Sequence, residues 1–373
     1  MGNSPPQVTP PETMRRWVLT EVNKDVSKAK LNLETVPVPT PKSGQVLIKV
    51  IATPVNPSDY GVWCRNRPVT DPEPIGNEGS GICIQSGGGF YANSCVGKNV
   101  GFVCNVKNNN AYSEFVLVDA LKGVYILPDN VDVKDAASHF VNPYTACGFL
   151  DTVRERHVQS STSPLPGFVH TAACSQLGQM LVKLCLKEKI ILINVVRREE
   201  QAETLRQLGA KYVVVTKGGE WEIELKKLIK EHGIQFAFDA VAGEMTGKIL
   251  KLLPKKGTMF VYGRLSNQPC SEIQPLDLIY MRKKLEGWFL SSWATEGGMF
   301  AAQRRLKAAT KVVHEGLADK ESGWPHSQFE DCSLEEMQEK FLDFYRNGFT
   351  GRKLRIVMDD SSDQADSNDE TKD

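Results

Sequence analysis

The feature that most constrains the fold is a rhythm of apolar strands and helical segments between residues 144 and 293. The apolar runs are GFVHTA, KIILINVV, KYVVV, QFAFDA and TMFVYG, and segments with helical periodicity separate them. Continuous apolar strands that alternate with helices are typical of a parallel sheet covered on both faces. We therefore expect a doubly wound α/β domain in this part of the chain.

The segments on either side of this domain have a different pattern. Between Trp17 and about Pro143 the sequence breaks into short strand-like runs bounded by Gly, Pro or Asn. After Trp293, two helical segments lead to a strand-like run, KLRIVM, which we expect to return to the first domain. The predicted division is a mobile tail at 1–14, a mainly β, discontinuous domain at 15–143 and 294–358, the α/β domain at 144–293, and a disordered acidic tail at 359–373.

Charge and cysteine content exclude several functional classes. The chain has 45 basic and 45 acidic residues and a formal net charge of zero, so nothing favours nucleic acid as a partner. No apolar run approaches the roughly 20 residues that cross a bilayer. Nine cysteines without a Cys-x-x-Cys pair are typical of a reducing compartment. We expect a cytoplasmic protein without a membrane partner.

The strongest local feature is the turn after the first α/β strand, in GFVHTAACSQLGQMLVKLC. Dinucleotide loops commonly have the spacing G-x-x-G-x-x-G, and small residues let such a backbone approach a pyrophosphate at a helix N-terminus. We predict that this turn binds a dinucleotide through Ala172, Cys174, Ser175, Gln176, Leu177 and Gly178. A tight turn without a ligand is the alternative, because only Gly178 retains the glycine of the pattern.

The second strand, KIILINVV, ends in Arg197 and Arg198 and not in an acidic residue. An Asp or Glu there would bind the ribose 2′-hydroxyl of NAD, whereas arginine can bind the 2′-phosphate of NADP with two hydrogen bonds. We therefore predict NADPH as the cofactor and Arg197 as the phosphate ligand. We interpret Arg198 as a solvated surface charge.

Two later strand ends complete the predicted cofactor site. They lie at the carboxyl edge of the sheet, where open α/β sheets bind ligands. The residues that we expect around the nicotinamide half are Ala240, Val241, Tyr262, Gly263 and Arg264. Ordinary strand-to-loop turns are an equal alternative, because Gly and Ala are common there.

Seven motifs, in order between residues 17 and 357, resemble the medium-chain dehydrogenase/reductase superfamily. They are VNPSDY, PIGNEGSG, VGKNVG, AYSEF, VNPYTA, the Ala-x-x-Ser-x-x-Gly loop and LRQLGA. The chain is most similar to the zinc-free quinone oxidoreductases and trans-2-enoyl thioester reductases, and VNPYTA favours the latter. The resemblance implies a GroES-like catalytic domain, a Rossmann NADP-binding domain, a homodimer, and reduction of a small-molecule acceptor. This acceptor is a quinone or an activated C=C bond of an enal, enone or enoyl thioester.

The departures from the superfamily concern zinc. Zinc-dependent relatives have a Cys and a His where this sequence has Asn56 and Asn77. A tetrahedral zinc site needs thiolate and imidazole ligands, so we expect no metal. Alcohol oxidation then lacks its Lewis acid, whereas hydride delivery to an acceptor already polarised by a carbonyl needs less help.

The resemblance also assigns the catalytic candidates Asn56, Asp59, Tyr60 and Arg67, and adds Thr145 to the cofactor site. Asn56 could donate a hydrogen bond to the nicotinamide ribose or the acceptor, and Tyr60, Tyr144 or bulk water could supply the proton. Packing beside Trp63 is the alternative for Tyr60. Arg67 replaces a tyrosine of the relatives, and it either binds an anionic acceptor or lies on the surface. The alternative function is a catalytically weak NADPH-binding protein that acts through protein partners.

Overall fold

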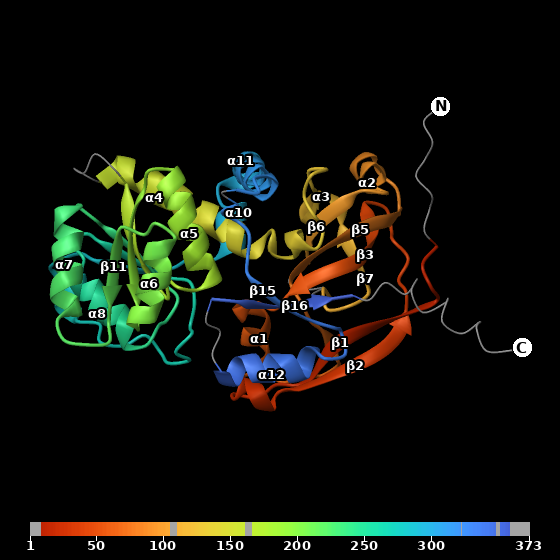
Figure 1. Cartoon of the computed structure of the whole chain (residues 1–373), viewed down its shortest axis with the longest axis horizontal. Coiled ribbons are helices and arrows are strands. Elements are labelled where there is room, and N and C mark those ends of the chain that lie inside the picture. Colours follow the sequence, from red (N-terminus) through yellow and green to blue (C-terminus); the bar gives the residue numbers. More distant parts are fainter. Residues whose placement is uncertain (1–8, 105–109, 161–165, 322, 348–350, 359–373) are drawn as a thin grey trace, which may run out of the picture. The chain divides into compact units, whose positions relative to one another are not determined.

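The computed structural model describes residues 9–104, 110–160, 166–321, 323–347 and 351–358 (Figure 1). The chain divides into two compact units, of which the first is Met1–Phe140 with Ser327–Asp373 and the second is Val141–His326. Three differences from the predicted division follow. Residues 141–143, predicted for the first domain, belong to the second unit. Residues 294–326 belong to the second unit and not to the discontinuous domain. Residues 13 and 14, predicted as tail, begin a strand. The remaining predicted tails include residues 1–8 and 359–373, which lie outside the described residues.

The first unit is mainly β, as predicted. Its elements are β1 (Thr13–Glu21), η1 (Val26–Lys28), β2 (Lys30–Pro37), β3 (Gln45–Pro54), α1 (Pro57–Trp63), β4 (Glu73–Pro74), β5 (Glu78–Ser86), α2 (Phe90–Cys95), β6 (Asn99–Val103), β7 (Phe115–Asp119), α3 (Ala120–Gly123), β8 (Val124–Ile126), η2 (Asp135–Ser138), β15 (Phe329–Cys332), α12 (Met337–Asn347) and β16 (Lys353–Val357). A seven-stranded sheet has the order β15-β16-β3-β5-β6-β8 with β7 paired to β3, and a three-stranded sheet has the order β2-β1-β4.

The chain end returns to the first unit, as the KLRIVM run predicts. β16 pairs antiparallel with β3, with Ile356 opposite Thr53, and parallel with β15. Side chains of β3, β5, β6 and α12 share one core, in which Trp63, Phe102, Tyr112 and Phe341 are fully buried. β16 thereby carries residues from the far end of the sequence next to the start of α1.

The second unit is a doubly wound parallel sheet with the strand order β11-β10-β9-β12-β13-β14. Its elements are α4 (Val141–Ser160), β9 (Gly167–Thr171), α5 (Gln176–Lys187), β10 (Ile191–Val196), α6 (Glu199–Gln207), β11 (Tyr212–Val215), α7 (Trp221–Glu231), β12 (Phe236–Asp239), α8 (Glu244–Leu252), β13 (Thr258–Val261), α9 (Pro275–Ile279), β14 (Lys284–Gly287), α10 (Leu290–Thr295) and α11 (Gly298–Ala318). All its strand pairs are parallel. The predicted Rossmann-type fold is confirmed.

Helices cover both faces of this sheet (Figure 1). On one face, Leu225 of α7 and Ile249 of α8 pack against Val169 and Ile193. On the other, Phe149 of α4 stacks on Phe238 with 3.9 Å between ring centroids. Strand order reverses direction between β9 and β12, and a switch point of this kind creates a crevice at the carboxyl edge of the sheet. Within the described residues, no helix is long and apolar enough to cross a membrane.

Candidate functional site

The predicted dinucleotide loop lies at the switch point, between β9 and α5. Ala172 has a left-handed backbone with φ of 50°. Ser175 caps the helix, because its Oγ accepts a hydrogen bond of 3.2 Å from the backbone N–H of Gly178. The first helical residues, Gln176 and Leu177, are buried. The remaining amides of the first helical turn have no helical acceptor, so this helix start suits an anion.

Gly178 is required by packing. A Cβ on this residue would lie 2.0 Å from the carbonyl oxygen of Ala173, far inside the closest contact that a Cβ makes. The glycine therefore lets α5 pack directly on the turn after β9, which is the role that the sequence predicts for it. Whether the loop binds a pyrophosphate stays a prediction.

The two arginines after β10 differ in their surroundings. The backbone N–H of Arg197 donates to the Oε1 of Gln201 at 3.1 Å, while its exposed side chain contacts no described residue through a hydrogen bond or ion pair. Burial raises the pKa of the Cys174 thiol, and the positive charge of Arg198 partly opposes this shift. The Arg198 side chain is 47% exposed and lies 4.0 Å from the carboxylate of Glu200, in keeping with a surface charge.

Asp239 joins the ends of β9 and β12. Its buried carboxylate accepts hydrogen bonds from the hydroxyls of Thr171 at 2.7 Å and Thr246 at 2.6 Å. It also accepts from the backbone N–H groups of Val241 at 2.9 Å and Ala242 at 3.2 Å. The predicted residues Ala240 and Val241 are therefore held rigidly beside the dinucleotide loop. The sequence gave no indication that the Asp239 carboxylate would bind the ends of β9 and β12 and the start of α8 to one another.

The turn after β13 lies beside the same edge. The backbone N–H of Leu265 donates to the carbonyl of Ala240 at 2.9 Å, and a Cβ on Gly263 would lie 2.8 Å from that carbonyl oxygen. Gly263 therefore lies close to the turn after β12. Such an approach is required if the turns after β12 and β13 are to contact the same nicotinamide. Arg264 is exposed.

Tyr262 points away from that edge. Its hydroxyl and the Nε2 of His170 are 2.7 Å apart, and its ring packs 4.8 Å from the ring of Phe149. Burial lowers the pKa of His170 to about 3, so this imidazole is neutral, and burial raises the pKa of Tyr262. Only the backbone of Tyr262 thus remains for the predicted contact with nicotinamide. Thr145 likewise uses its hydroxyl on the carbonyl of Val141 in its own helix, at 2.6 Å.

In the first unit, Asn56 belongs to a buried polar network that sequence reasoning missed. Its Nδ2 donates to the Oε1 of Glu78 at 2.9 Å, and its Oδ1 accepts from the Nζ of Lys353 at 2.5 Å. The same Nζ donates to Ser138 Oγ at 2.8 Å. The backbone N–H of Phe140 donates to the Oε2 of Glu78 at 2.9 Å. These contacts fix both ends of the Asn56 carboxamide.

Asp59 lies at the start of α1 beside this network. Its Oδ2 accepts from the backbone N–H of Asn56 at 2.7 Å and from the hydroxyl of Tyr112 at 3.0 Å. Its buried Oδ1 has no hydrogen-bond partner among the described residues. Burial raises the pKa of Asp59 to about 7 and lowers the pKa of Lys353 to about 8. The geometry makes Asp59 a support for α1, and direct contact with an acceptor stays a prediction.

The residues at the zinc positions do not fit zinc. Asn56 Oδ1 is bound to the ammonium of Lys353, which would repel a divalent cation, and Asn77 Nδ2 donates to Ser58 Oγ at 3.1 Å. In the part of the chain that the structure describes, no group of three His, Cys, Asp or Glu side chains could hold a metal ion. Zinc needs such thiolate, imidazole or carboxylate ligands.

Tyr60 lies one turn along α1 from Asn56, and Arg67 follows the end of this helix. The Tyr60 ring packs 5.5 Å from Phe341 and 6.5 Å from Trp63, in keeping with the packing alternative. Burial raises the pKa of Tyr60, so its phenol remains protonated at neutral pH. The Arg67 side chain is 77% exposed and lies 3.7 Å from Glu73. This position favours the surface interpretation of Arg67.

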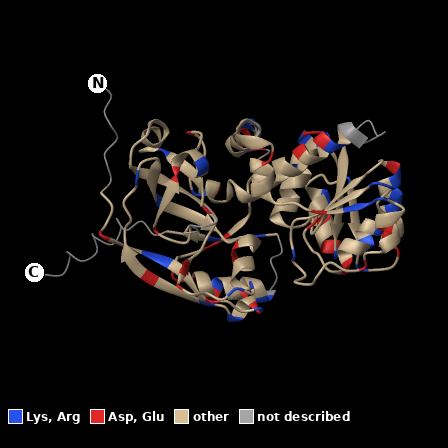
Figure 2. Cartoon of the chain, turned by 180° about the vertical axis from the view of Figure 1, so that it is seen from behind, with Lys and Arg blue, Asp and Glu red and all other residues tan. Residues whose placement is uncertain are grey.

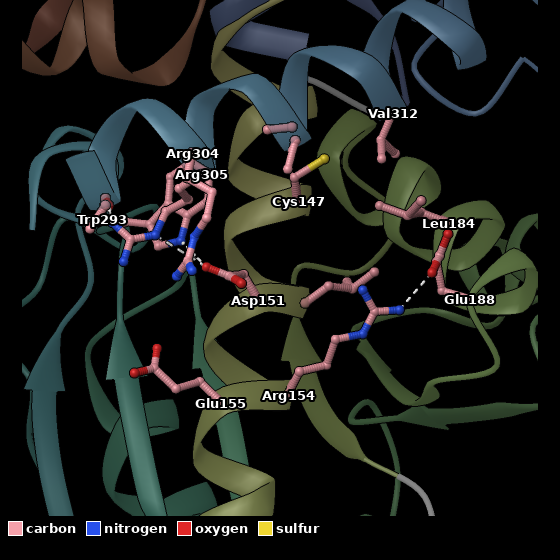
Figure 3. A pocket seen from close by; sticks show the side chains of 14 residues that line it. Cys147, Asp151, Arg154, Glu155, Leu184, Glu188, Trp293, Arg304, Arg305 and Val312 are labelled. Carbon is pink, nitrogen blue, oxygen red and sulfur yellow. Dashed lines mark hydrogen bonds and ion pairs between the residues drawn. The ribbon is translucent and has the colours of Figure 1, made fainter. Parts of the chain in front are cut away.

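A groove of about 700 Å³ lies elsewhere in the second unit, between α4, α5 and α11 (Figure 3). Arg154 and Glu188 pair at one end, and Asp151 binds Arg305 and Trp293 at the other (Figure 3). Its lining contains three basic and three acidic residues and none of the dinucleotide loop. The groove therefore has no net charge with which to attract an anionic cofactor.

Comparison with known proteins places these sites in context. The family model described as "Zinc-binding dehydrogenase" matches residues 177–303. The chain is 29% identical over 281 residues to the mitochondrial enoyl-[acyl-carrier-protein] reductase of Xenopus tropicalis, covering 71% of this chain and 75% of the relative. For the corresponding Mus musculus protein the identity is 28% over 276 residues, covering 70% and 68%.

Solved structures show the same fold. A Mesorhizobium loti protein described as an NADPH:quinone reductase has a TM-score of 0.81 and 28% identity, over 94% of this chain and all of its own. The Escherichia coli quinone oxidoreductase complexed with NADPH has a TM-score of 0.75 and 18% identity, over 92% of this chain and 99% of its own. At that lower identity the likeness concerns the fold alone.

Proposed function

The chain belongs to the medium-chain dehydrogenase/reductase superfamily, in its zinc-free quinone and enoyl reductase branch, and on this premise we propose that it is an NADPH-dependent reductase of an activated C=C bond. The observation that carries the proposal is the capped, glycine-packed loop at the switch point of a Rossmann sheet. The enoyl reductases among the sequence relatives favour an enoyl thioester as acceptor. A quinone is the second candidate, because the Mesorhizobium loti structure is equally similar in sequence.

The second unit supplies the groups that would hold NADPH. Backbone amides at the start of α5 would bind the pyrophosphate, and Arg197 would bind the 2′-phosphate. The backbone around Ala240, Val241 and Gly263 holds the nicotinamide half. When bound, NADPH supplies the hydride, which is the difficult step of the chemistry.

The first unit supplies an oriented donor for the acceptor. Glu78 takes one hydrogen of the Asn56 amide, and Lys353 fixes its oxygen, so the second amide hydrogen points in a set direction. A donor held in place in this way stabilises the negative charge that develops on a thioester or quinone oxygen. We assign the proton donation to Tyr60, whose phenol is protonated at neutral pH.

The test follows NADPH oxidation with panels of enoyl-CoA esters, enals or enones, and quinones, with NADH as the matched control. We expect turnover of the enoyl esters with NADPH and much slower turnover with NADH. Turnover of quinones alone would move the assignment to the second candidate. Tight binding of NADPH without oxidation in any panel would contradict the proposed enzyme and favour a binding protein.

We further propose a homodimer formed at β14. Within the described residues, this edge strand of the second unit pairs only with β13. Large apolar side chains are exposed on and around it: Leu276, Ile279, Tyr280, Leu285 and Phe289. An open edge with exposed apolar residues favours pairing with a second copy. Light scattering should give the dimer mass, and Leu285→Lys should give the monomer; a monomeric parent protein would contradict this.

The proposed compartment is the cytoplasm. All nine cysteines are free thiols, which suits reducing conditions. A fluorescent fusion of the full chain should distribute through the cytoplasm, and accumulation in mitochondria, the location named for the curated relatives, would contradict this proposal.

A further inference from the structure

A cavity of about 490 Å³ opens at the amino edge of the second unit's sheet. It is formed by the end of α5, the start of β10, the turn into β11 and the end of α7. The lining residues that carry charge, rings or a buried amide are Lys189, Asn194, Lys211, Tyr212 and His232, and the rest of the lining is mainly aliphatic. The dinucleotide loop lies at the opposite, carboxyl edge, so this cavity is separate from the proposed cofactor site.

Asn194 provides a buried acceptor without a donor. Its side chain is 1% exposed, and its Nδ2 donates to the carbonyl of Tyr212 at 3.1 Å. Its Oδ1 accepts no hydrogen bond from any residue that the structure describes. Buried acceptors in native proteins are nearly always satisfied, so a partner for this oxygen is expected from outside the chain. Because Asn194 lines the cavity, a ligand there can supply the N–H or O–H group.

The cavity is also positively charged. Lys189 and Lys211 are exposed at its wall, and neither ammonium forms an ion pair with a described residue. The lining contains no Asp or Glu. The larger groove between α4, α5 and α11 differs, because its bases are balanced by an equal number of acids (Figure 3). The cavity at the amino edge therefore favours an anion.

A planar ring fits the remaining walls. The rings of Tyr212 and His232 lie 4.4 Å apart, and the aliphatic side chains of Val182 and Leu192 complete an apolar surface. Small-molecule sites combine apolar and aromatic walls with a few placed polar groups, and their volumes begin at about 300 Å³. The cavity has this composition and is large enough for one ring with a charged substituent.

We propose that this cavity is a second ligand site, which binds a nucleoside monophosphate through an N–H group of its base (the exocyclic amine of adenine or the imide N–H of uracil) at Asn194 and through its phosphate at Lys189 and Lys211. The assignment does not depend on the proposed reductase activity. A ligand with the same ring but no phosphate, or with the phosphate but no ring, would satisfy only part of the site.

The test is calorimetric titration of the full chain with AMP and UMP in the presence of saturating NADPH. NADPH occupies the proposed cofactor site, so the remaining binding reports the second cavity. We expect ribose 5-phosphate and adenosine to bind about tenfold more weakly than AMP. NADPH contains an adenosine phosphate of its own and can compete at both sites, so AMP and UMP are also titrated without NADPH. Failure of both nucleotides to bind under either condition would overturn the proposal.

Variants test the assigned residues. Lys189→Gln and Lys211→Gln should each weaken AMP binding by about two- to fivefold at low salt. Lys187→Gln, an exposed lysine of α5 outside the cavity lining, is the matched control and should leave binding unchanged. Asn194→Leu should weaken AMP about tenfold while affecting ribose 5-phosphate much less. If Asn194→Leu fails to fold, the lysine variants decide the question. Equal affinity for AMP in Lys187→Gln, Lys189→Gln and Lys211→Gln would overturn the proposed site.

Discussion

Replacing Gly178 by alanine tests whether the packing of α5 on the turn after β9 shapes the cofactor site. The added Cβ would lie 2.0 Å from the Ala173 carbonyl oxygen, whereas contacts under 3.0 Å essentially never occur, so the helix start must move by about 1 Å. Alanine gains up to about 1 kcal/mol over glycine from helix propensity. Overpacking costs about 1–3 kcal/mol. The cost of overpacking should therefore exceed the gain in helix propensity, and Gly178→Ala should lower the free energy of unfolding.

The expected effect on binding is larger than the effect on folding. Moving the α5 amides away from the pyrophosphate should remove at least one charge-assisted hydrogen bond, which corresponds to a roughly tenfold to hundredfold weaker Kd for NADPH. Thermal unfolding should shift down by several degrees, about 2–4 °C for each kcal/mol lost. Calorimetric titration with NADPH and a thermal melt measure both quantities.

Gly61→Ala is the matched control, because a Cβ at this helical glycine meets nothing within 4 Å. It should stabilise the protein by up to about 1 kcal/mol and leave the affinity for NADPH unchanged. An unchanged NADPH affinity and melting temperature in Gly178→Ala would refute the assigned role of this glycine.

Three further predictions concern single side chains. Arg197→Ala should weaken NADPH binding about tenfold while leaving NADH binding unaffected; equal losses for both cofactors would remove the 2′-phosphate assignment. The pKa of Asp59 rises from 3.8 to about 7 on folding. Its protonated form therefore stabilises the fold below about pH 4, and up to about 4 kcal/mol is lost as pH rises to about 7. Urea unfolding at several pH values should show this loss in the parent protein, and Asp59→Asn should abolish it. Tyr60→Phe should lower turnover without changing NADPH affinity, and unchanged turnover would retire Tyr60 as the proton donor.

The local sequence pattern was sufficient to predict the strands, the helices and the candidate dinucleotide loop of the second unit. Apolar periodicity identified its strands and helices, and the small residues between Ala172 and Gly178 identified the turn, because each of these signals lies within one short segment. Side-chain direction was harder to predict. Tyr262 follows a strand at the ligand edge, yet its hydroxyl meets His170, and nothing in the local sequence specifies that pairing.

The polar network of the first unit could not be predicted in the same way. Lys353 and Asn56 are 297 residues apart in the sequence, and their contact arises only because β16 pairs with β3. One signal was present, since Lys353 begins a strand that alternates basic and apolar residues and is almost entirely buried. A charge in such a strand needs a partner, and the search for one would have led to Glu78 and Asn56.

The most direct test of the central claim uses NADPH labelled with deuterium at the reactive carbon of the nicotinamide, with an enoyl-CoA ester as acceptor. Mass spectrometry of the product should show a saturated thioester that carries one deuterium from the cofactor, and Gly178→Ala should form it more slowly. Tight NADPH binding with no labelled product from any enoyl ester, enone or quinone would contradict the account.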